Sequence, residues 1–120
     1  MAVTNGPNLG LIINAATGDT FDTDFRKLLR GIDALLNCSV ISRTTTAPPG
    51  TPANGDRYIV PSGPTGAWAG QADKIACWTT DDPASPVGKW EVWTPRAGFR
   101  AYSQADSALY VYNGTGCVPA

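Results

Sequence analysis

The chain has 120 residues, of which only 16% are charged, and nine basic against ten acidic side chains give a formal net charge of −1. A chain of this length forms one domain with a modest core and a terminal appendage, not two domains. The charges are scattered without a basic face or stripe, so we expect no nucleic-acid partner.

Residues 1–20 are rich in Gly, Pro, Asn and Thr and predict an extended arm. The arm carries an apolar patch formed by Leu9, Leu11, Ile12 and Ile13. Burying apolar surface gains about 25 cal/mol per Å², so we expect this patch to dock on a partner surface. The run is too short to cross a bilayer, and no basic signal-peptide start precedes it. We therefore expect no membrane insertion.

One clear helix is predicted at about Asp22 to Asn37, within a helical segment at residues 21–43. Asp22 and Asp24 place negative charge in the first turn, where the helix dipole favours it. Apolar side chains recur at spacings of four and three residues as a seam of about two heptads. The seam consists of Phe21, Phe25, Leu28, Ile32 and Leu35, widened by Leu29 and Leu36. It suits either packing on the chain's own sheet or an interface between copies of the chain, and the pattern leaves both open.

Prolines and glycines exclude regular structure from residues 44–56 and predict a stiff, extended linker. Residues 57–120 then predict a small antiparallel β-domain of five to six short strands separated by turn residues. The predicted strands are Arg57–Val60, Asp73–Thr79, Lys89–Trp93, Phe99–Tyr102 and Ala108–Tyr112, with Cys117 and Val118 as a short sixth strand. A helix followed by a sheet indicates an α+β fold.

Catalytic chemistry finds little support in the sequence. The chain contains no histidine, which is the commonest general base and metal ligand. The three cysteines, Cys38, Cys77 and Cys117, are widely spaced and form no zinc motif, and Cys77 is expected to be a small buried apolar residue. We expect no enzymatic activity, no catalytic residue, no cofactor and no metal. Glu91 is expected to face solvent or an arginine across the sheet.

Aromatic side chains are concentrated in the predicted β-domain. Trp90 and Trp93 are three residues apart in one strand, so they face opposite sides of the sheet. Trp68 lies in a glycine-flanked loop and is expected to be the most accessible tryptophan. Exposed aromatics stack on sugar rings, whereas buried aromatics fill small cores or interfaces. Trp68, Trp90 and Trp93 are therefore candidates for glycan or partner contact, with core or interface packing favoured.

Several motifs occur in a distinctive order. The helical segment FRKLLRGIDALL at Phe25 to Leu36 is followed by PANGDRYIV, which ends at Val60, and by TGAWAG at Thr65 to Gly70. TPR begins at Thr94, and LYVYNGTG ends at Gly116. This order resembles a family of uncharacterised domains found in phage tail and head-fibre proteins and in gene transfer agents. The resemblance covers roughly residues 24 to 118.

The resemblance implies a structural component of a phage or phage-like particle. It implies an oligomeric fibre, spike or adaptor protein of the tail or capsid, with a homotrimer as the expected state and other virion proteins as partners. The protein would be made in the host bacterial cytoplasm and located in the virion. Two alternatives remain open: a carbohydrate-binding module that recognises a host surface glycan, and a capsid decoration protein.

Overall fold

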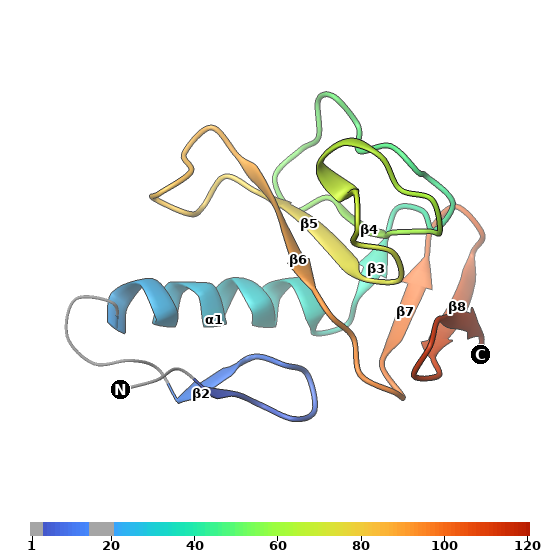
Figure 1. Cartoon of the computed structure of the whole chain (residues 1–120), viewed down its shortest axis with the longest axis horizontal. Coiled ribbons are helices and arrows are strands. Elements are labelled where there is room, and N and C mark those ends of the chain that lie inside the picture. The colour runs from blue at the N-terminus through green and yellow to red at the C-terminus, as the bar shows by residue number, and fades with distance from the viewer. Residues whose placement is uncertain (1–3, 15–20) are drawn as a thin grey trace.

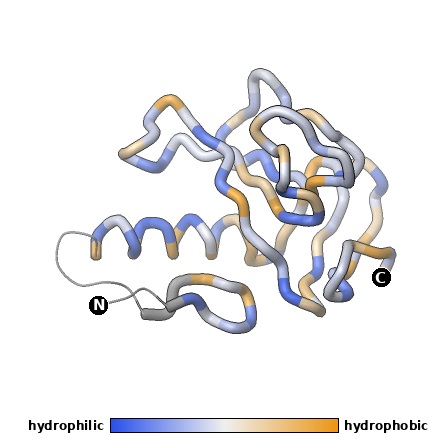
Figure 2. Tube along the Cα trace, viewed as in Figure 1, coloured by the Kyte–Doolittle hydropathy of each residue, from blue (hydrophilic) through white to orange (hydrophobic). Residues whose placement is uncertain are grey.

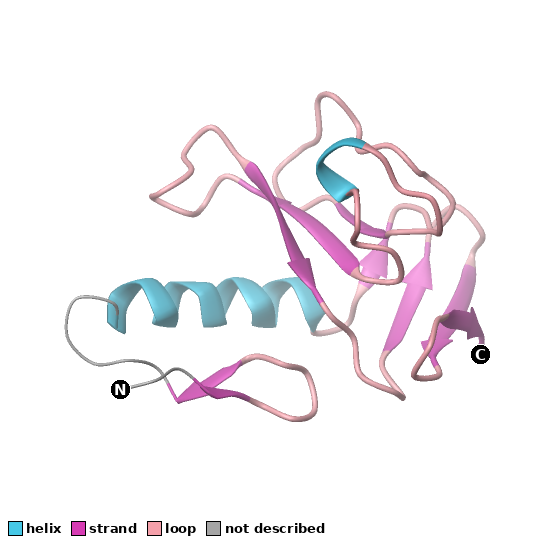
Figure 3. Cartoon of the chain, in the orientation of Figure 1, coloured by secondary structure: helices cyan, strands magenta, loops and turns pink. Residues whose placement is uncertain are grey.

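The computed structural model describes residues 4–14 and 21–120 and confirms the predicted α+β class. Helix α1 (Phe21–Leu35) precedes two small, mainly antiparallel sheets. The strands of these two sheets gather in a compact body, and the N-terminal half of the helix extends away from it (Figure 1). Figure 3 shows the same separation, with long loops over the strands at the far end from the helix.

The first sheet is an antiparallel meander in the order β4-β5-β6. Its strands are β4 (Arg57–Ile59), β5 (Ile75–Thr79) and β6 (Lys89–Trp93). The short 3-10 helix η2 (Gly66–Trp68) lies in the connection between β4 and β5. All three strands were predicted from the sequence.

The second sheet has the order β3-β7-β8-β9. Its strands are β3 (Ser39–Val40), β7 (Arg100–Ser103), β8 (Ala108–Tyr112) and β9 (Cys117–Pro119). The last three confirm the prediction, whereas the parallel pairing of β3 with β7 was not foreseen. The backbone N–H of Ile41 donates to the Arg57 carbonyl at 2.8 Å, so the chain after β3 also joins the two sheets.

The main core lies between the two sheets and the C-terminal end of the helix. The helix contributes Ala34 and Leu35, and the segment after it contributes Cys38. The strands contribute Val40, Ile59, Ile75, Cys77, Trp93 and Ala101. A second cluster on the opposite face of the first sheet consists of Tyr58, Val60, Trp68 and Ala76. The helix and the strands therefore form one folding unit.

Residues 44–56 contain no helix or strand, as predicted, but they do not act as a spacer. The N–H of Gly55 donates to the Trp78 carbonyl at 2.8 Å, and the Thr46 carbonyl accepts from Thr65 N–H at 3.1 Å. Such bonds satisfy backbone groups of an irregular segment that lies on the domain. The expected linker is therefore corrected to a surface loop of the same domain.

The described part of the predicted arm is folded as a hairpin. Strands β1 (Thr4–Asn5) and β2 (Ile12–Asn14) pair antiparallel, and the hairpin lies beside the helix (Figure 1). Leu11 packs against the main core. The expectation of an extended arm is thus wrong for this stretch, because it forms a hairpin and Leu11 packs within the chain. Residues 1–3 and 15–20 of the predicted arm lie outside the described residues.

The helix meets the body at Gly31, a buried glycine in the middle of α1. A Cβ atom added there would overlap Cδ2 of Leu11 and would lie 2.8 Å from Cη2 of Trp93. A glycine in a helix interior costs about 1 kcal/mol relative to alanine. Packing explains the glycine at position 31, because a residue without a side chain lets the helix, the hairpin and β6 approach one another closely.

We predict that Gly31→Ala lowers the free energy of unfolding by about 1–3 kcal/mol, although alanine is the better helix former, because the added methyl group overpacks the contact with Trp93. Chemical denaturation followed by circular dichroism measures the change. Gly50→Ala is the control, since nothing lies within 4 Å of an added Cβ at Gly50. A stabilising effect of Gly31→Ala would contradict this account of the contact between the helix and Trp93.

Candidate functional site: an apolar face of the helix

Polar contacts are made at both ends of helix α1. Nε of Arg26 donates to Asp22 at 2.8 Å, four residues earlier on the exposed surface. At the other end, Nη1 of Arg57 in β4 donates to the Ala34 carbonyl at 3.0 Å, and Asn37 follows with a positive φ of 50°. A left-handed residue after the last turn is a common helix stop. The Arg57 contact ties the C-terminal turn to the first sheet.

The predicted seam is split between the core and the surface. Leu35 is only 6% exposed and belongs to the main core, and Leu28 is half-buried. The remaining three residues of the seam are exposed together with Leu29 and Leu36. The contact at Gly31 turns the helix so that the row of exposed apolar residues differs from the predicted heptad positions.

This exposed row, which we call the helix row, runs along the whole length of α1. It consists of Phe21, Phe25, Leu29, Ile32 and Leu36, each at least 41% exposed. Phe21 and Phe25 stack on each other with ring centroids 6.2 Å apart. Figure 2 shows apolar residues recurring between hydrophilic ones along this helix. At 1.5 Å per residue the row is about 22 Å long, which makes it a continuous apolar surface.

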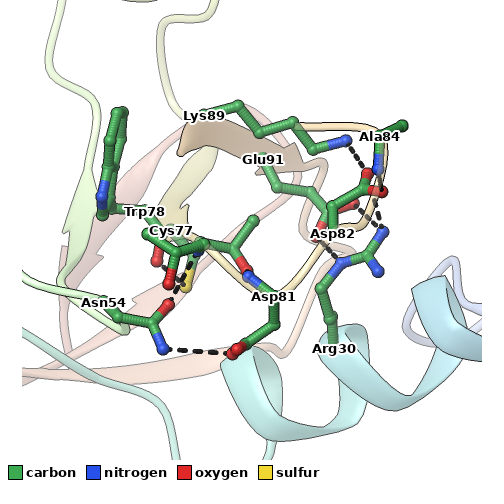
Figure 4. Close-up of polar contacts among 11 residues, drawn as sticks. Arg30, Asn54, Cys77, Trp78, Asp81, Asp82, Ala84, Lys89 and Glu91 are labelled. Atoms are coloured by element: carbon green, nitrogen blue, oxygen red, sulfur yellow. Dashed lines mark hydrogen bonds and ion pairs between the residues drawn. The ribbon is translucent and has the colours of Figure 1, made fainter. Parts of the chain in front are cut away.

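A buried ion-pair network fixes a different side of the helix to the sheet. Nε and Nη2 of Arg30 donate to the two carboxylate oxygens of Glu91 at 2.9 and 3.1 Å, and Nη2 lies 3.5 Å from Asp82 (Figure 4). Nζ of Lys89 donates to the same Asp82 carboxylate. The predicted solvent or cross-sheet position of Glu91 is wrong, since it is 8% exposed and paired with the helix. A bidentate arginine pair of this kind fixes orientation as well as position.

The network shifts the ionisation of its members. The hydrogen bond from Lys89, followed by that from the Ala84 N–H, holds the pKa of Asp82 below its ordinary value of 3.8. The hydrogen bond to Glu91 raises the pKa of Arg30. Because the folded pKa of Asp82 is depressed, its stabilising contribution is present above about pH 4 and is lost as the pH falls below that value.

A cleft of about 310 Å³ lies next to the network and includes Asp33, Cys77 and Asp81 in its lining. Burial raises the pKa of the Cys77 thiol to about 11, and burial does the same to Cys38. Both thiols are therefore protonated near neutral pH and are poor nucleophiles. The predicted burial of Cys77 is confirmed, with an exposed fraction of 8%. All three cysteines are free.

The tryptophans predicted for glycan or partner contact are mostly internal. Trp68 is 0% exposed, so its expected accessibility is wrong. Helix η2 folds the loop back onto the first sheet, where the Trp68 ring lies 5.3 Å from Tyr58 and 5.1 Å from Trp90, centroid to centroid. Trp93 lies in the main core, and half-buried Trp90 packs on the other face of the sheet, as their spacing predicted. Neither Trp68 nor Trp93 offers a face for stacking on a sugar.

The four residues predicted for particle docking are also divided. Leu9 is 37% exposed at the end of the hairpin loop, whereas Leu11 contacts the core. The side chains of Ile12 and Ile13 lie outside what the structure describes. The helix row, by contrast, consists of five exposed apolar residues along one element. The sequence already indicated part of the helix row, because Leu29 and Leu36 widen the predicted seam.

The described residues contain no group of three or more His, Cys, Asp or Glu side chains placed to bind a metal ion. Among the same residues, no helix is long and apolar enough to cross a membrane.

The fold and this surface define a small α+β domain with an exposed apolar row along its helix. A family model described as "Protein of unknown function (DUF2793)" matches residues 27–118, and the chain belongs to this family. The match includes most of α1 and every strand from β3 to β8, whereas the N-terminal hairpin lies outside it. A comparison with curated proteins found none that matches the chain.

We predict that Arg30→Leu lowers the free energy of unfolding by about 3–5 kcal/mol, because it leaves Glu91 buried without its partner. The double variant Arg30→Leu/Glu91→Leu is expected to recover most of this loss. Arg26→Gln, which removes an exposed ion pair, is the matched control and is expected to cost less than about 1 kcal/mol. Urea denaturation measures all three. A single variant as stable as the control would show that the network does not anchor the helix.

Proposed function

We propose that the protein is a non-enzymatic structural component of a phage or phage-like particle, assembled as a homotrimer in a fibre, spike or adaptor of the tail or capsid. The observation that carries the proposal is the helix row. Its five apolar side chains project from a helix whose opposite side is already anchored by Gly31 and by the Arg30 network. Self-association would remove this surface from water.

The order of motifs supports the virion setting, because it resembles domains of phage tail and head-fibre proteins. The chemistry of the described residues fits a structural role as well. The buried carboxylates of Glu91 and Asp82 pair with Arg30 and Lys89, and the two buried thiols are protonated near neutral pH. In this proposal the partners are other copies of the chain and neighbouring virion proteins.

The burial of Trp68 and Trp93 bears on the alternative of a glycan-binding module. The hypothesis needed an exposed aromatic face, and these two rings are instead used in the two cores. We therefore favour self-association over carbohydrate recognition. A capsid decoration protein would use the same helix row and differs from a fibre or adaptor only in its place on the particle.

We predict that Ile32→Asp converts the wild-type oligomer into a folded monomer, because a charge in the middle of the helix row would be buried without a partner in the interface. Multi-angle light scattering measures the mass, and circular dichroism checks the fold. Val87→Asp is the control, since Val87 is 89% exposed in the loop between β5 and β6. A monomeric wild type, or an oligomeric Ile32→Asp variant, would contradict the proposed interface.

A second measurement tests the virion setting. Purified particles are expected to contain the protein at a copy number divisible by three, as quantified by mass spectrometry against isotope-labelled standard peptides. Ile32→Asp is expected to be lost from particles, whereas Val87→Asp is expected to be incorporated normally. Absence of the wild-type protein from purified particles would overturn the virion assignment and would leave self-association as a separate result.

A further inference from the structure

The second sheet has an apolar outer face. Its register places Tyr102 of β7 opposite Leu109 of β8, and Val111 of β8 opposite Val118 of β9. Directly opposed residues share one side of a sheet, and so do residues two apart in one strand. Tyr102, Leu109, Val111 and Val118 therefore form a single surface, which we call the outer sheet face.

This face is open to solvent, unlike the other side of the same strands. Tyr102 is 42% exposed, Leu109 is 43% exposed and Val118 is 37% exposed. The alternate residues Ala101, Ser103 and Tyr110 are buried. A sheet with an apolar face is normally covered by a second layer, most often helices or another sheet. Helix α1 of the same chain instead contributes its C-terminal end to the core on the inner side.

Charge at the edge of each apolar surface is complementary. Arg100 lies on the outer sheet face, opposite Val111, and is exposed. Asp33 borders the helix row, since it lies four residues after Leu29, and it is also exposed. Neither side chain has a hydrogen bond or an ion pair with another of the residues that the structure describes. A contact between the two surfaces would bring opposite charges together at its rim.

We infer that the outer sheet face receives the helix row of the next copy of the chain, so that copies associate head to tail through a helix-on-sheet contact. The dimensions are compatible, since the five residues of β8 span about 17 Å against about 22 Å for the helix row. The inference rests on the proposed self-association and specifies its geometry. A contact between two different surfaces closes into a ring when the rotation between copies permits, and closure after three copies gives the homotrimer.

Mixing two variants tests this contact directly. Ile32→Asp disables the helix row and leaves the outer sheet face intact, whereas Leu109→Asp disables the sheet face and leaves the helix row intact. Each variant is expected to be monomeric alone. Mixed in equal amounts, they are expected to form a one-to-one heterodimer, because one copy supplies a working helix and the other a working sheet. Light scattering measures the masses, with Val87→Asp as the control for an exposed apolar-to-acidic change.

The outcomes separate this inference from the proposal on which it rests. If Leu109→Asp keeps the wild-type mass, or if two monomeric variants form no heterodimer, the head-to-tail contact is wrong and the helix row still accounts for self-association. If Ile32→Asp keeps the wild-type mass, the proposed interface itself fails.

A charge exchange at the rim provides an independent test that avoids an apolar-to-acidic change. Arg100→Asp and Asp33→Arg are each expected to weaken association about fivefold, and the double variant is expected to restore it. Sedimentation equilibrium over a concentration series measures the three affinities. A double variant that associates no better than either single variant would overturn the pairing of these two surfaces.

Discussion

The close contact between Gly31 of helix α1 and Trp93 of strand β6 is the constraint on which the remaining structure depends. A helix that touches an indole ring at one position has little rotational freedom, because neighbouring side chains are 100° apart around its axis. With Gly31 against Trp93, Ala34 and Leu35 enter the core. The same rotation directs Phe25, Leu29 and Ile32 outward, and their exposure is thus a consequence of how the helix is anchored.

The charged network reinforces this orientation from another side. Arg30 reaches Glu91 and Asp82, which lie in β6 and in the loop before it, so that an ion pair joins residues 61 positions apart in the chain. Removing one partner of such a buried pair is strongly destabilising, so the network holds the helix in this orientation. In this protein that orientation leaves the helix row on the surface.

The aromatic side chains show how a small β-domain obtains a core on both faces of a thin sheet. Trp93 fills one side of the β4-β5-β6 sheet. On the other side Trp90 packs edge to face with both Tyr58 and Trp68. These rings supply the large buried areas that a chain of this size needs. The helix row and the outer sheet face remain exposed, while other residues of the same elements, such as Leu35 and Ala101, lie in the main core.

Local patterns in the sequence determined the helix, the six strands of the two meanders and the turns between them. These features depend on the spacing of apolar residues and on Pro, Gly and Asn at defined positions, which act over a few residues. Tertiary structure alone decided the rest: the pairing of β3 with β7, the burial of Trp68, the contact of Glu91 with Arg30 and the choice of exposed helix face. Each of these joins residues distant in the chain, and glycine-flanked Trp68 or strand residue Glu91 has the same local pattern whether it faces water or the core. Long-range packing decides between a buried and an exposed position for such a side chain, because its contacts are with residues distant in the sequence.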